Sequence, residues 1–288
     1  MKLALGTAQF GLDYGVNNTS GQVTKDEARK MLSLSIQKGI KLIDTAISYG
    51  QSEMALGSIG TNGFDIVTKI PGYPSHLMGV DEWLIGQVES SFSRLGVTSI
   101  YAILLHRPID LLGNVGGKLY STLEMLKDTG KVQKVGVSIY SPDELLPLVS
   151  KYSLDIVQAP YNLIDRRLSK SGWLTRLNEM GTEVHTRSVF LQGLLLMDPT
   201  RIPEKFRPWE QIWNEWNNWI ASADVTRLQA CLSLPLKTIG IDRVVVGADN
   251  LNQLKQILDC AENEGALKYP ELSCVDERLI NPTNWAYL

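Results

Sequence analysis

Short apolar runs that alternate with amphipathic segments are the feature that most restricts the fold of this 288-residue chain. In the amphipathic segments, apolar residues recur at helical spacing. The apolar runs are expected to form strands at 3–5, 42–44, 64–68, 101–105, 132–137, 155–158, 183–186 and 243–246. Strands that alternate with helices predict parallel βαβ units. Eight such units close into a (β/α)8 TIM barrel.

The segments between the strands carry signals that begin and end helices. Helices are expected at 24–38, 81–95, 119–129, 142–150, 169–180 and about 250–262. Thr24 is the expected N-cap of the first helix, with Glu27 three residues later and Gly39 at its end. An open, doubly wound sheet is the alternative, but such sheets usually carry a G-x-G-x-x-G turn after the first strand, and none follows residues 3–5.

Residues 1–288 are expected to form one domain, because α/β barrels of this length and composition usually do. An insertion at about 189–235 and an irregular C-terminal tail at about 267–288 interrupt the alternation. The insertion carries four tryptophans at helical spacing, expected to cover the barrel wall, with substrate contact as the alternative: Trp209, Trp213, Trp216 and Trp219. The tail is compatible with crossing the open end of the barrel or with packing on its side.

Charge and cysteine usage exclude several classes of protein. The net charge is -3 and no Lys/Arg-rich run is present, which argues against nucleic-acid binding by a basic surface. No apolar stretch is long enough to span a bilayer, and the N-terminus lacks the apolar core of a signal peptide. Three widely spaced cysteines, Cys231, Cys260 and Cys274, indicate free thiols in a cytoplasmic protein without a metal site.

Four titratable side chains come at or just after the ends of the second, third and fourth expected strands: Asp44, Tyr49, Lys69 and His106. In a (β/α)8 barrel these strand ends converge on one mouth, so we expect the four side chains to meet there. Each also has an ordinary structural explanation. Asp44 can cap a helix, Lys69 can lie in a loop, and His106 can be a core histidine bonded to the backbone.

Together the four residue types suit proton transfer to a carbonyl oxygen. A phenol has an unperturbed pKa of roughly 10, and a nearby lysine ammonium is expected to lower the pKa of Tyr49. A carboxylate such as Asp44 keeps a buried Lys69 cationic. A histidine beside the phenol can orient and polarise a carbonyl group.

Several motifs in these regions resemble the aldo-keto reductase family, in order from residue 3 to roughly 260. Residues 5–7 read Leu-Gly-Thr, 44–50 match Asp-Thr-Ala-x-x-Tyr-Gly, 52–57 match Ser-Glu-x-x-Leu-Gly, 67–69 read Val-Thr-Lys, 104–106 read Leu-Leu-His, 130–138 match Gly-Lys-Val-x-x-x-Gly-Val-Ser, and 158–162 match Gln-x-x-Tyr-Asn. The resemblance implies a barrel reductase with Tyr49 as the general acid, Asp44 and Lys69 as its tuners, and His106 as the carbonyl-orienting residue.

The resemblance also implies a nicotinamide cofactor that is bound without a Rossmann fingerprint. Ser138, Gln158 and Asn162 match residues that hold the nicotinamide amide, and the stretch 187–194 resembles one that wraps the ribose and pyrophosphate. The implied cofactor-binding residues are Gly6, Thr7, Ser138, Gln158, Asn162, Arg187, Ser188, Leu191, Gly193, Gly247, Asp249, Asn250 and Gln253.

The choice between NADPH and NADH stays open at this stage. Family members that prefer NADPH often place a basic residue after strand eight to receive the 2′-phosphate, but residues 247–253 contain no Arg or Lys. Asp249 would repel that phosphate and could accept a hydrogen bond from a free 2′-hydroxyl. The family favours NADPH, whereas these residues favour NADH.

The expected substrate is a small-molecule aldehyde or ketone, and a sugar or sugar-like carbonyl compound is one candidate. Candidate lining residues of the mouth are Phe10, Asp13, Tyr14 and the loop to Gln22, Tyr73, His76, and the segment 189–220. One alternative is a dinucleotide-binding sensor or regulatory protein on the same barrel with little turnover. A weaker alternative is another barrel enzyme, such as an isomerase or lyase.

Overall fold

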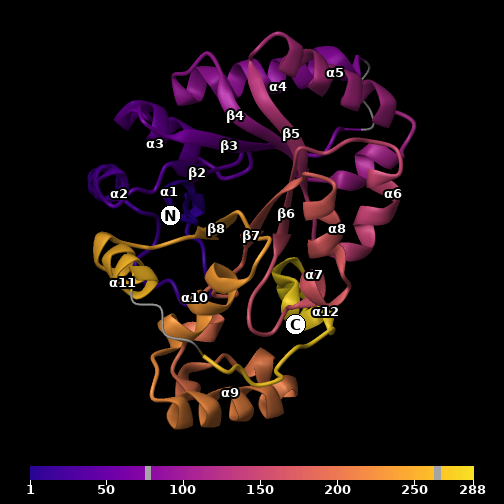
Figure 1. The fold of residues 1–288 in the computed structure, drawn as a ribbon. Coiled ribbons are helices and arrows are strands. Elements are labelled where there is room, and N and C mark those ends of the chain that lie inside the picture. Colours follow the sequence, from indigo (N-terminus) through magenta and orange to yellow (C-terminus); the bar gives the residue numbers. More distant parts are fainter. Residues whose placement is uncertain (75–78, 263–266) are drawn as a thin grey trace.

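Eight parallel strands, paired in sequence order, form the closed barrel of the computed structural model, which describes residues 1–74, 79–262 and 267–288 (Figure 1). The strands are β1 (Leu3–Gly6), β2 (Leu42–Asp44), β3 (Asp65–Ile70), β4 (Ile100–Leu105), β5 (Val132–Ser138), β6 (Ile156–Pro160), β7 (Glu183–Arg187) and β8 (Arg243–Val246). Because β1 also pairs with β8, the sheet has no free edge. The predicted (β/α)8 barrel is confirmed.

Helices surround the barrel (Figure 1). They are α1 (Ala8–Gly11), α2 (Lys25–Gln37), α3 (Ser52–Ile59), α4 (Val80–Leu95), α5 (Gly116–Asp128), α6 (Leu145–Val149), α7 (Arg167–Lys170), α8 (Trp173–Glu179), α9 (Glu210–Ala223), α10 (Arg227–Lys237), α11 (Leu251–Glu262) and α12 (Glu277–Ile280). The single helix expected at 169–180 is divided into α7 and α8, because Gly172 adopts a left-handed conformation with φ 79°. Across the described ranges, no helix combines the length and the apolar character needed to cross a bilayer.

The start of α2 has the predicted N-cap, and its Glu27 side chain also bonds to another helix. The Thr24 side chain accepts the backbone N–H of Glu27, as the sequence predicts. The Glu27 carboxylate accepts the backbone N–H of Leu251 through Oε1 over 2.7 Å, and its Oε2 lies 3.7 Å from the Lys30 ammonium of the same helix. One acidic side chain therefore satisfies an N–H group in the first turn of α11, in a helix far away in sequence.

The middle of the barrel is apolar. A cluster of buried side chains fills it: Ala4, Leu42, Val67, Ala102, Leu104, Ile156 and Val245. Side chains two residues apart on a strand share a face, so Lys69 lies one step beyond Val67 toward the C-terminal end of the barrel. Polar side chains also lie deep in the sheet on β6 and β7, where buried Gln158 pairs with buried His185.

The tryptophans of the insertion are not positioned as predicted. Helix α9 lies outside α10 at the margin of the molecule (Figure 1). The indole N–H groups of Trp209, Trp213, Trp216 and Trp219 donate to the Asp276 carboxylate and to the backbone carbonyls of Phe206, Leu195 and Lys268, respectively. These partners belong to the insertion and the C-terminal tail. The four tryptophans therefore join the insertion to the C-terminal tail. Each indole N–H needs a hydrogen-bond acceptor when it is buried, and these two segments supply the acceptors.

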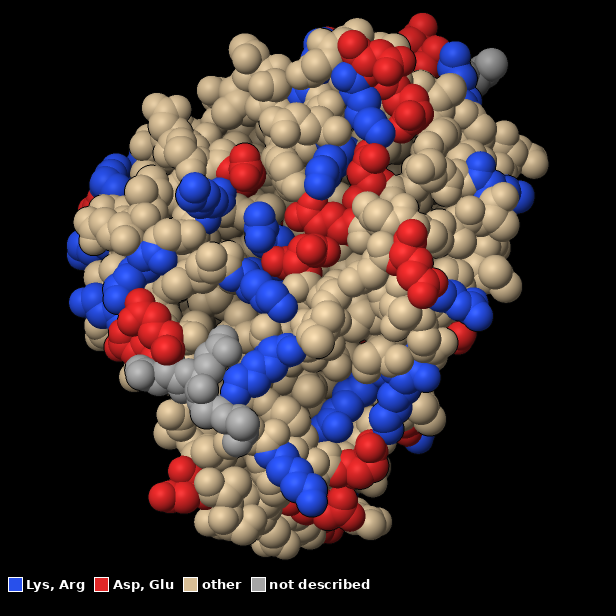
Figure 2. Space-filling view, in the orientation of Figure 1, with Lys and Arg blue, Asp and Glu red and all other residues tan. Residues whose placement is uncertain are grey.

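Charges of both signs are interspersed on the surface. On the face shown in Figure 2, Lys and Arg lie beside Asp and Glu, and neither sign forms an extended patch. This pattern agrees with the net charge of -3.

Candidate active site

A cavity of about 690 Å³ lies at the C-terminal ends of the strands. Its wall includes residues that follow β1, β2, β4, β5, β7 and β8, together with parts of α10, α11 and the tail. Three of the four predicted catalytic residues, Asp44, Tyr49 and His106, contribute to this wall. The structure therefore brings together side chains from separate strands at one mouth, as the barrel predicts.

Lys69 lies behind the cavity wall and is paired with Asp44. The Lys69 ammonium donates to Asp44 Oδ1 over 2.6 Å and to the Thr45 carbonyl over 2.9 Å, and only 1% of the Lys69 surface is exposed. Gln158 Nε2 donates to the other carboxylate oxygen, Oδ2, over 2.6 Å. Burial lowers the pKa of Lys69, and the charge and hydrogen bond of Asp44 oppose that change. Both carboxylate oxygens of Asp44 are thus already occupied.

Tyr49 and His106 face the cavity side by side. Their ring centroids are 6.0 Å apart and the rings meet edge to face at 75°. The Lys69 ammonium lies 5.1 Å from the centroid of the Tyr49 ring. Within the described ranges, the Tyr49 hydroxyl has no hydrogen-bond partner, so it is available to a ligand in the cavity.

The pKa shifts at this site differ from the sequence-based expectation. Burial, and then the Asp44 charge, raise the pKa of Tyr49 above its ordinary value, and the opposing effect of Arg187 is smaller. The expected lowering by Lys69 is not seen, because Asp44 neutralises the ammonium and burial dominates. Burial, followed by Lys69 and Arg187, lowers the pKa of His106 to about 4. Near neutral pH the cavity therefore presents a protonated phenol and a neutral imidazole.

The three residues matched to the nicotinamide amide do not reach the cavity wall. Ser138 and Gln158 are buried, with 3.4 Å between Ser138 Oγ and Gln158 Oε1. Asn162 is buried as well: its Oδ1 accepts the backbone N–H groups of two following residues, and its Nδ2 donates to the Ser188 carbonyl. All three side chains are bonded to protein groups here, and their contact with a cofactor stays a prediction.

A strained segment after β7 forms one side of the cavity. Ser188, Leu191 and Gln192 have positive φ angles of 61°, 47° and 53°, and Gly193 has φ 89°. Such angles are uncommon for residues other than glycine and occur most often at functional sites. Ser188, Gln192 and Gly193 line the cavity, whereas Leu191 is buried in the core. A Cβ on Gly193 would lie only 2.8 Å from the Cβ of Asn17, so the loop after β1 packs directly against this segment.

Arg187 lies where β7 meets this segment. Its guanidinium donates to the Ile139 carbonyl and to Ser188 Oγ, and it lies 4.6 Å from the ring centroid of Tyr140. Tyr140 also lines the cavity, and the sequence analysis did not identify it. The sequence feature that could have indicated Tyr140 as a site residue is its position two residues after the end of β5.

The turn after β8 contributes Gly247, Asp249 and Gln253 to the cavity wall. Asp249 and Gln253 bond to each other twice, from the Asp249 backbone N–H to Gln253 Oε1 over 2.8 Å and from Gln253 Nε2 to Asp249 Oδ2 over 3.2 Å. Asn250 is not on the wall, and its Oδ1 accepts the backbone N–H of Gln253. Arg227, from the start of α10, lines the same cavity. The sequence analysis missed this arginine because it lies 22 residues before Asp249 in the chain.

The predicted substrate-facing residues are only partly correct. Tyr14 lines the cavity, and burial is the largest cause that raises its pKa to about 12. Phe10 is in the core, Asp13 is exposed and off the wall, and Tyr73 is buried against Trp83. Hydrophobic packing explains the position of Phe10, because it lies in α1 and all four residues of that helix are buried. His76 lies outside the described residues.

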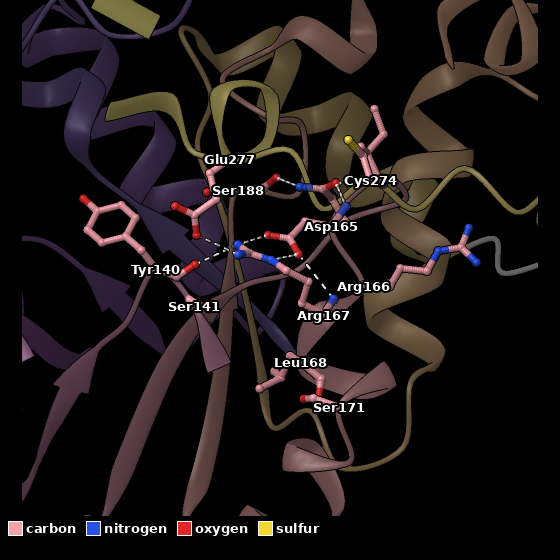
Figure 3. Close-up of polar contacts among 12 residues, drawn as sticks. Tyr140, Ser141, Asp165, Arg166, Arg167, Leu168, Ser171, Ser188, Cys274 and Glu277 are labelled. Atoms are coloured by element: carbon pink, nitrogen blue, oxygen red, sulfur yellow. Dashed lines mark hydrogen bonds and ion pairs between the residues drawn. The ribbon is translucent and has the colours of Figure 1, made fainter. Parts of the chain in front are cut away.

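The C-terminal tail reaches the edge of the cavity, where Pro282 and Thr283 form part of the wall. Arg167 ties the tail to the barrel: its guanidinium bonds to both oxygens of Asp165, to Glu277 and to the Tyr140 carbonyl (Figure 3). A smaller cavity of about 320 Å³ lies beside Arg167. The two cationic residues that line it, Arg167 and Lys170, are already paired with the carboxylates of Asp165 and Glu271. These contacts hold the tail against the barrel and do not form an anion-binding site.

A phenol and a neutral imidazole at the C-terminal mouth of a barrel, in front of a buried lysine–carboxylate pair, define a class of barrel proteins suited to proton transfer. A sequence profile of the Aldo/keto reductase family matches residues 2–277. The chain belongs to this family, whose members are oxidoreductases.

Individual relatives are distant. A D-threo-aldose 1-dehydrogenase from Pseudomonas sp is 26% identical, with 91% of this chain and 92% of the relative covered. An L-glyceraldehyde 3-phosphate reductase from Escherichia coli O157:H7 is 25% identical, with 93% and 88% covered. The chain spans 64% of the length of an aldo-keto reductase from Mycobacterium sp. (strain KMS), at 26% identity.

Solved structures show the same fold. The holo form of an aldo-keto reductase from Bacillus halodurans superposes with a TM-score of 0.75 at 20% identity, covering 96% of this chain and 95% of that one. A glycerol dehydrogenase from Gluconobacter oxydans gives a TM-score of 0.70 at 22% identity, covering 92% and 88%.

Proposed function

We propose that this protein is an NAD(P)H-dependent reductase that converts an aldehyde or ketone to an alcohol, with Tyr49 as the general acid. The observation that carries the proposal is the arrangement at the cavity wall. The free hydroxyl of Tyr49 and the ring of His106 face the same cavity, and the Lys69–Asp44 pair lies directly behind them.

The residues divide the proton transfer among them. His106, neutral because its pKa is about 4, donates an N–H hydrogen bond that orients the substrate carbonyl oxygen. A nicotinamide cofactor held at this cavity would supply the hydride that reduces the carbonyl carbon. As negative charge develops on the oxygen, Tyr49 transfers its hydroxyl proton there. The phenolate left behind lies 5.1 Å, ring centroid to ammonium, from Lys69, which stabilises it.

The wall has the character that a dinucleotide needs. Arg187 and the N-terminal end of α10 supply positive potential, and the strained segment 188–193 presents backbone groups to the cavity. The turn at Gly247 packs closely against the Gln9 side-chain amide, since a Cβ at Gly247 would lie 2.6 Å from Gln9 Nε2. The proposed cofactor-binding residues are Gly6, Thr7, Ser138, Gln158, Asn162, Arg187, Ser188, Leu191, Gly193, Gly247, Asp249, Asn250 and Gln253.

We further propose a sugar or sugar-like carbonyl compound as the substrate. The names of the two relatives from Pseudomonas and Escherichia coli refer to an aldose and a triose phosphate. The first loop places the hydrogen-bonding side chains of Tyr14, Asn17 and Asn18 on the cavity wall, which suits a polyhydroxylated ligand. A cytoplasmic location fits the three free cysteines.

The test is a side-by-side fluorescence titration of the purified protein with NADPH and NADH, followed by absorbance assays with a panel of aldoses, ketoses and simple aldehydes. We expect tight binding of at least one cofactor and its oxidation by a panel member. Binding of neither cofactor would remove the reductase function and leave the fold. Tight binding without turnover of any carbonyl compound would favour a dinucleotide sensor.

A further inference from the structure

Arg227 is a cation on the cavity wall that the catalytic chemistry does not use. It is the first residue of α10 and lines the same cavity as Asp249, Gln253 and Gln256. Sequence position separates it from the turn after β8, but α10 packs against α11 and brings it to the same wall. The cavity region that lacks an Arg or Lys in its own loop therefore receives one from a neighbouring helix.

The bonds of Arg227 leave most of its guanidinium free. Its Nη2 donates to Asn217 Oδ1 over 2.6 Å, and the guanidinium lies 5.8 Å from the ring centroid of Trp216. Neither partner is charged, and among the described residues Arg227 forms no salt bridge. Burial lowers the pKa of Arg227, and the charge of Asp198 only partly opposes this.

Asp249, the acidic residue on this wall, is partly occupied. Its Oδ2 accepts a hydrogen bond from Gln253, whose own carbonyl oxygen is bonded to the Asp249 backbone. Asp249 has no cationic partner among the described residues. Two opposite charges thus line one cavity without pairing to each other.

We propose that Arg227 binds the 2′-phosphate of NADPH and so supplies, from α10, the positive charge that the turn after β8 lacks. The inference rests on the proposed function, because it assigns a residue to the proposed cofactor. It differs from the sequence-based interpretation of this region, in which Asp249 and the lack of an Arg or Lys in residues 247–253 favoured NADH.

The chemistry of the position fits a phosphate. A guanidinium offers two parallel N–H donors that match phosphate oxygens, and it remains charged at any physiological pH. Arg227 also begins an 11-residue helix, so backbone N–H groups and the helix dipole add positive potential at the same place. The capping box of Thr226 and Gln229 fixes the start of the helix there.

A purely structural role is the competing explanation. Arg227 could serve to join α10 to α9 through Asn217 and Trp216. Replacement of Asn217 by Ala removes that join and keeps the guanidinium. Replacement of Arg201 by Ala removes an exposed arginine from the same insertion, away from the cavity wall, and controls for net charge.

The experiment is calorimetric titration of the full-length protein with 2′,5′-ADP and with 5′-AMP, two fragments that differ only by the 2′-phosphate. We expect Arg227→Ala to weaken 2′,5′-ADP binding about tenfold or more and 5′-AMP binding less than about twofold. Arg227→Lys should keep part of the preference, whereas Asn217→Ala and Arg201→Ala should keep nearly all of it. A parallel NADPH and NADH titration should show the same loss of preference in Arg227→Ala.

Four outcomes would overturn the assignment. Equal losses for both fragments would place Arg227 on the shared adenosine 5′-phosphate portion, and no loss would remove it from the site. A loss in Asn217→Ala as large as that in Arg227→Ala would show a structural role. If the wild-type protein binds neither NADPH nor NADH, the proposed function itself fails. If it binds NADH but discriminates against the 2′-phosphate, only this inference fails.

Discussion

The two ends of the barrel carry the same four kinds of side chain in different arrangements. At the C-terminal end, Asp44, Tyr49 and His106 line a cavity of about 690 Å³, and Lys69 lies behind them. At the N-terminal end are Tyr101, Lys134, Glu183 and His185.

The N-terminal group closes on itself. Glu183 Oε2 accepts hydrogen bonds from the Tyr101 hydroxyl, over 2.6 Å, and from the Lys134 ammonium, and Glu183 Oε1 is 2.8 Å from His185 Nε2. Burial pushes the pKa of Glu183 up, but the hydrogen bonds from His185, Lys134 and Tyr101 outweigh it and hold the pKa below its ordinary value. The phenol at this end is therefore already committed to a carboxylate.

The C-terminal group leaves its donors free. Lys69 satisfies Asp44, so neither the Tyr49 hydroxyl nor the His106 ring is needed to balance charge. Residue types alone thus do not make a catalytic site. What distinguishes the C-terminal end is a phenol that has no hydrogen-bond partner among the described residues and lies beside a space for a ligand.

The largest expected effect separates the two phenols. Tyr49→Phe should lower kcat for carbonyl reduction by about 10³-fold, because the proton donor is lost, with nearly unchanged cofactor binding. Tyr101→Phe removes the same hydroxyl at the other end and should leave kcat within about twofold. Steady-state assays and cofactor titration of both variants decide the matter. Retained activity in Tyr49→Phe would eliminate it as the acid.

The second effect should appear in stability alone. Glu183→Ala leaves Tyr101, Lys134 and His185 without their shared acceptor, and should lower the free energy of unfolding by about 3 kcal/mol. Glu183→Gln keeps an acceptor and should lose less. Urea unfolding measures the change, and kcat of the folded variants should stay close to wild type. A catalytic defect without a stability loss would reverse the roles given to the two ends.

The third effect is a pH dependence at the C-terminal end. His106 has a folded pKa of about 4 against roughly 6.5 when unfolded, so the unfolded state binds more protons between these values. Stability should therefore fall as the pH drops from 7 to 5, by about 1–2 kcal/mol from this residue. The Glu183 contribution is lost only below its ordinary pKa of roughly 4.3, outside this window.

Urea unfolding at pH 7 and pH 5 can isolate the His106 contribution. The wild type should lose more stability between the two values than His106→Gln, which has no group that titrates at this position. Equal losses in the two proteins would show that the His106 imidazole is solvated enough to titrate normally.

The smallest effect concerns the far wall of the cavity. Asp249→Ala removes a negative charge from the wall that Arg227 shares, and should raise NADPH affinity relative to NADH by about three- to tenfold. Fluorescence titrations with both cofactors provide the ratio, with Asp13→Ala, an exposed acidic residue off the cavity wall, as the matched control. An unchanged ratio would remove Asp249 from cofactor selection.

The sequence by itself determined the architecture and the strand ends. Apolar periodicity and helix-terminating glycines are local signals, so the eight strands and the position of Asp44 and His106 at the mouth followed from them. The cap at Thr24 followed for the same reason, because it joins residues three apart.

Only the tertiary structure decided which polar groups are free. The sequence places Tyr49 after one strand and Tyr101 within another, but whether each hydroxyl is bonded depends on partners from other strands. The raised pKa of Tyr49 likewise depends on its burial and on the nearby charge of Asp44. The position of Arg227 on the cavity wall depends on the packing of α10 against α11. The interaction between two charges depends on the distance between them in space, and for residues far apart in the sequence the folded barrel sets that distance.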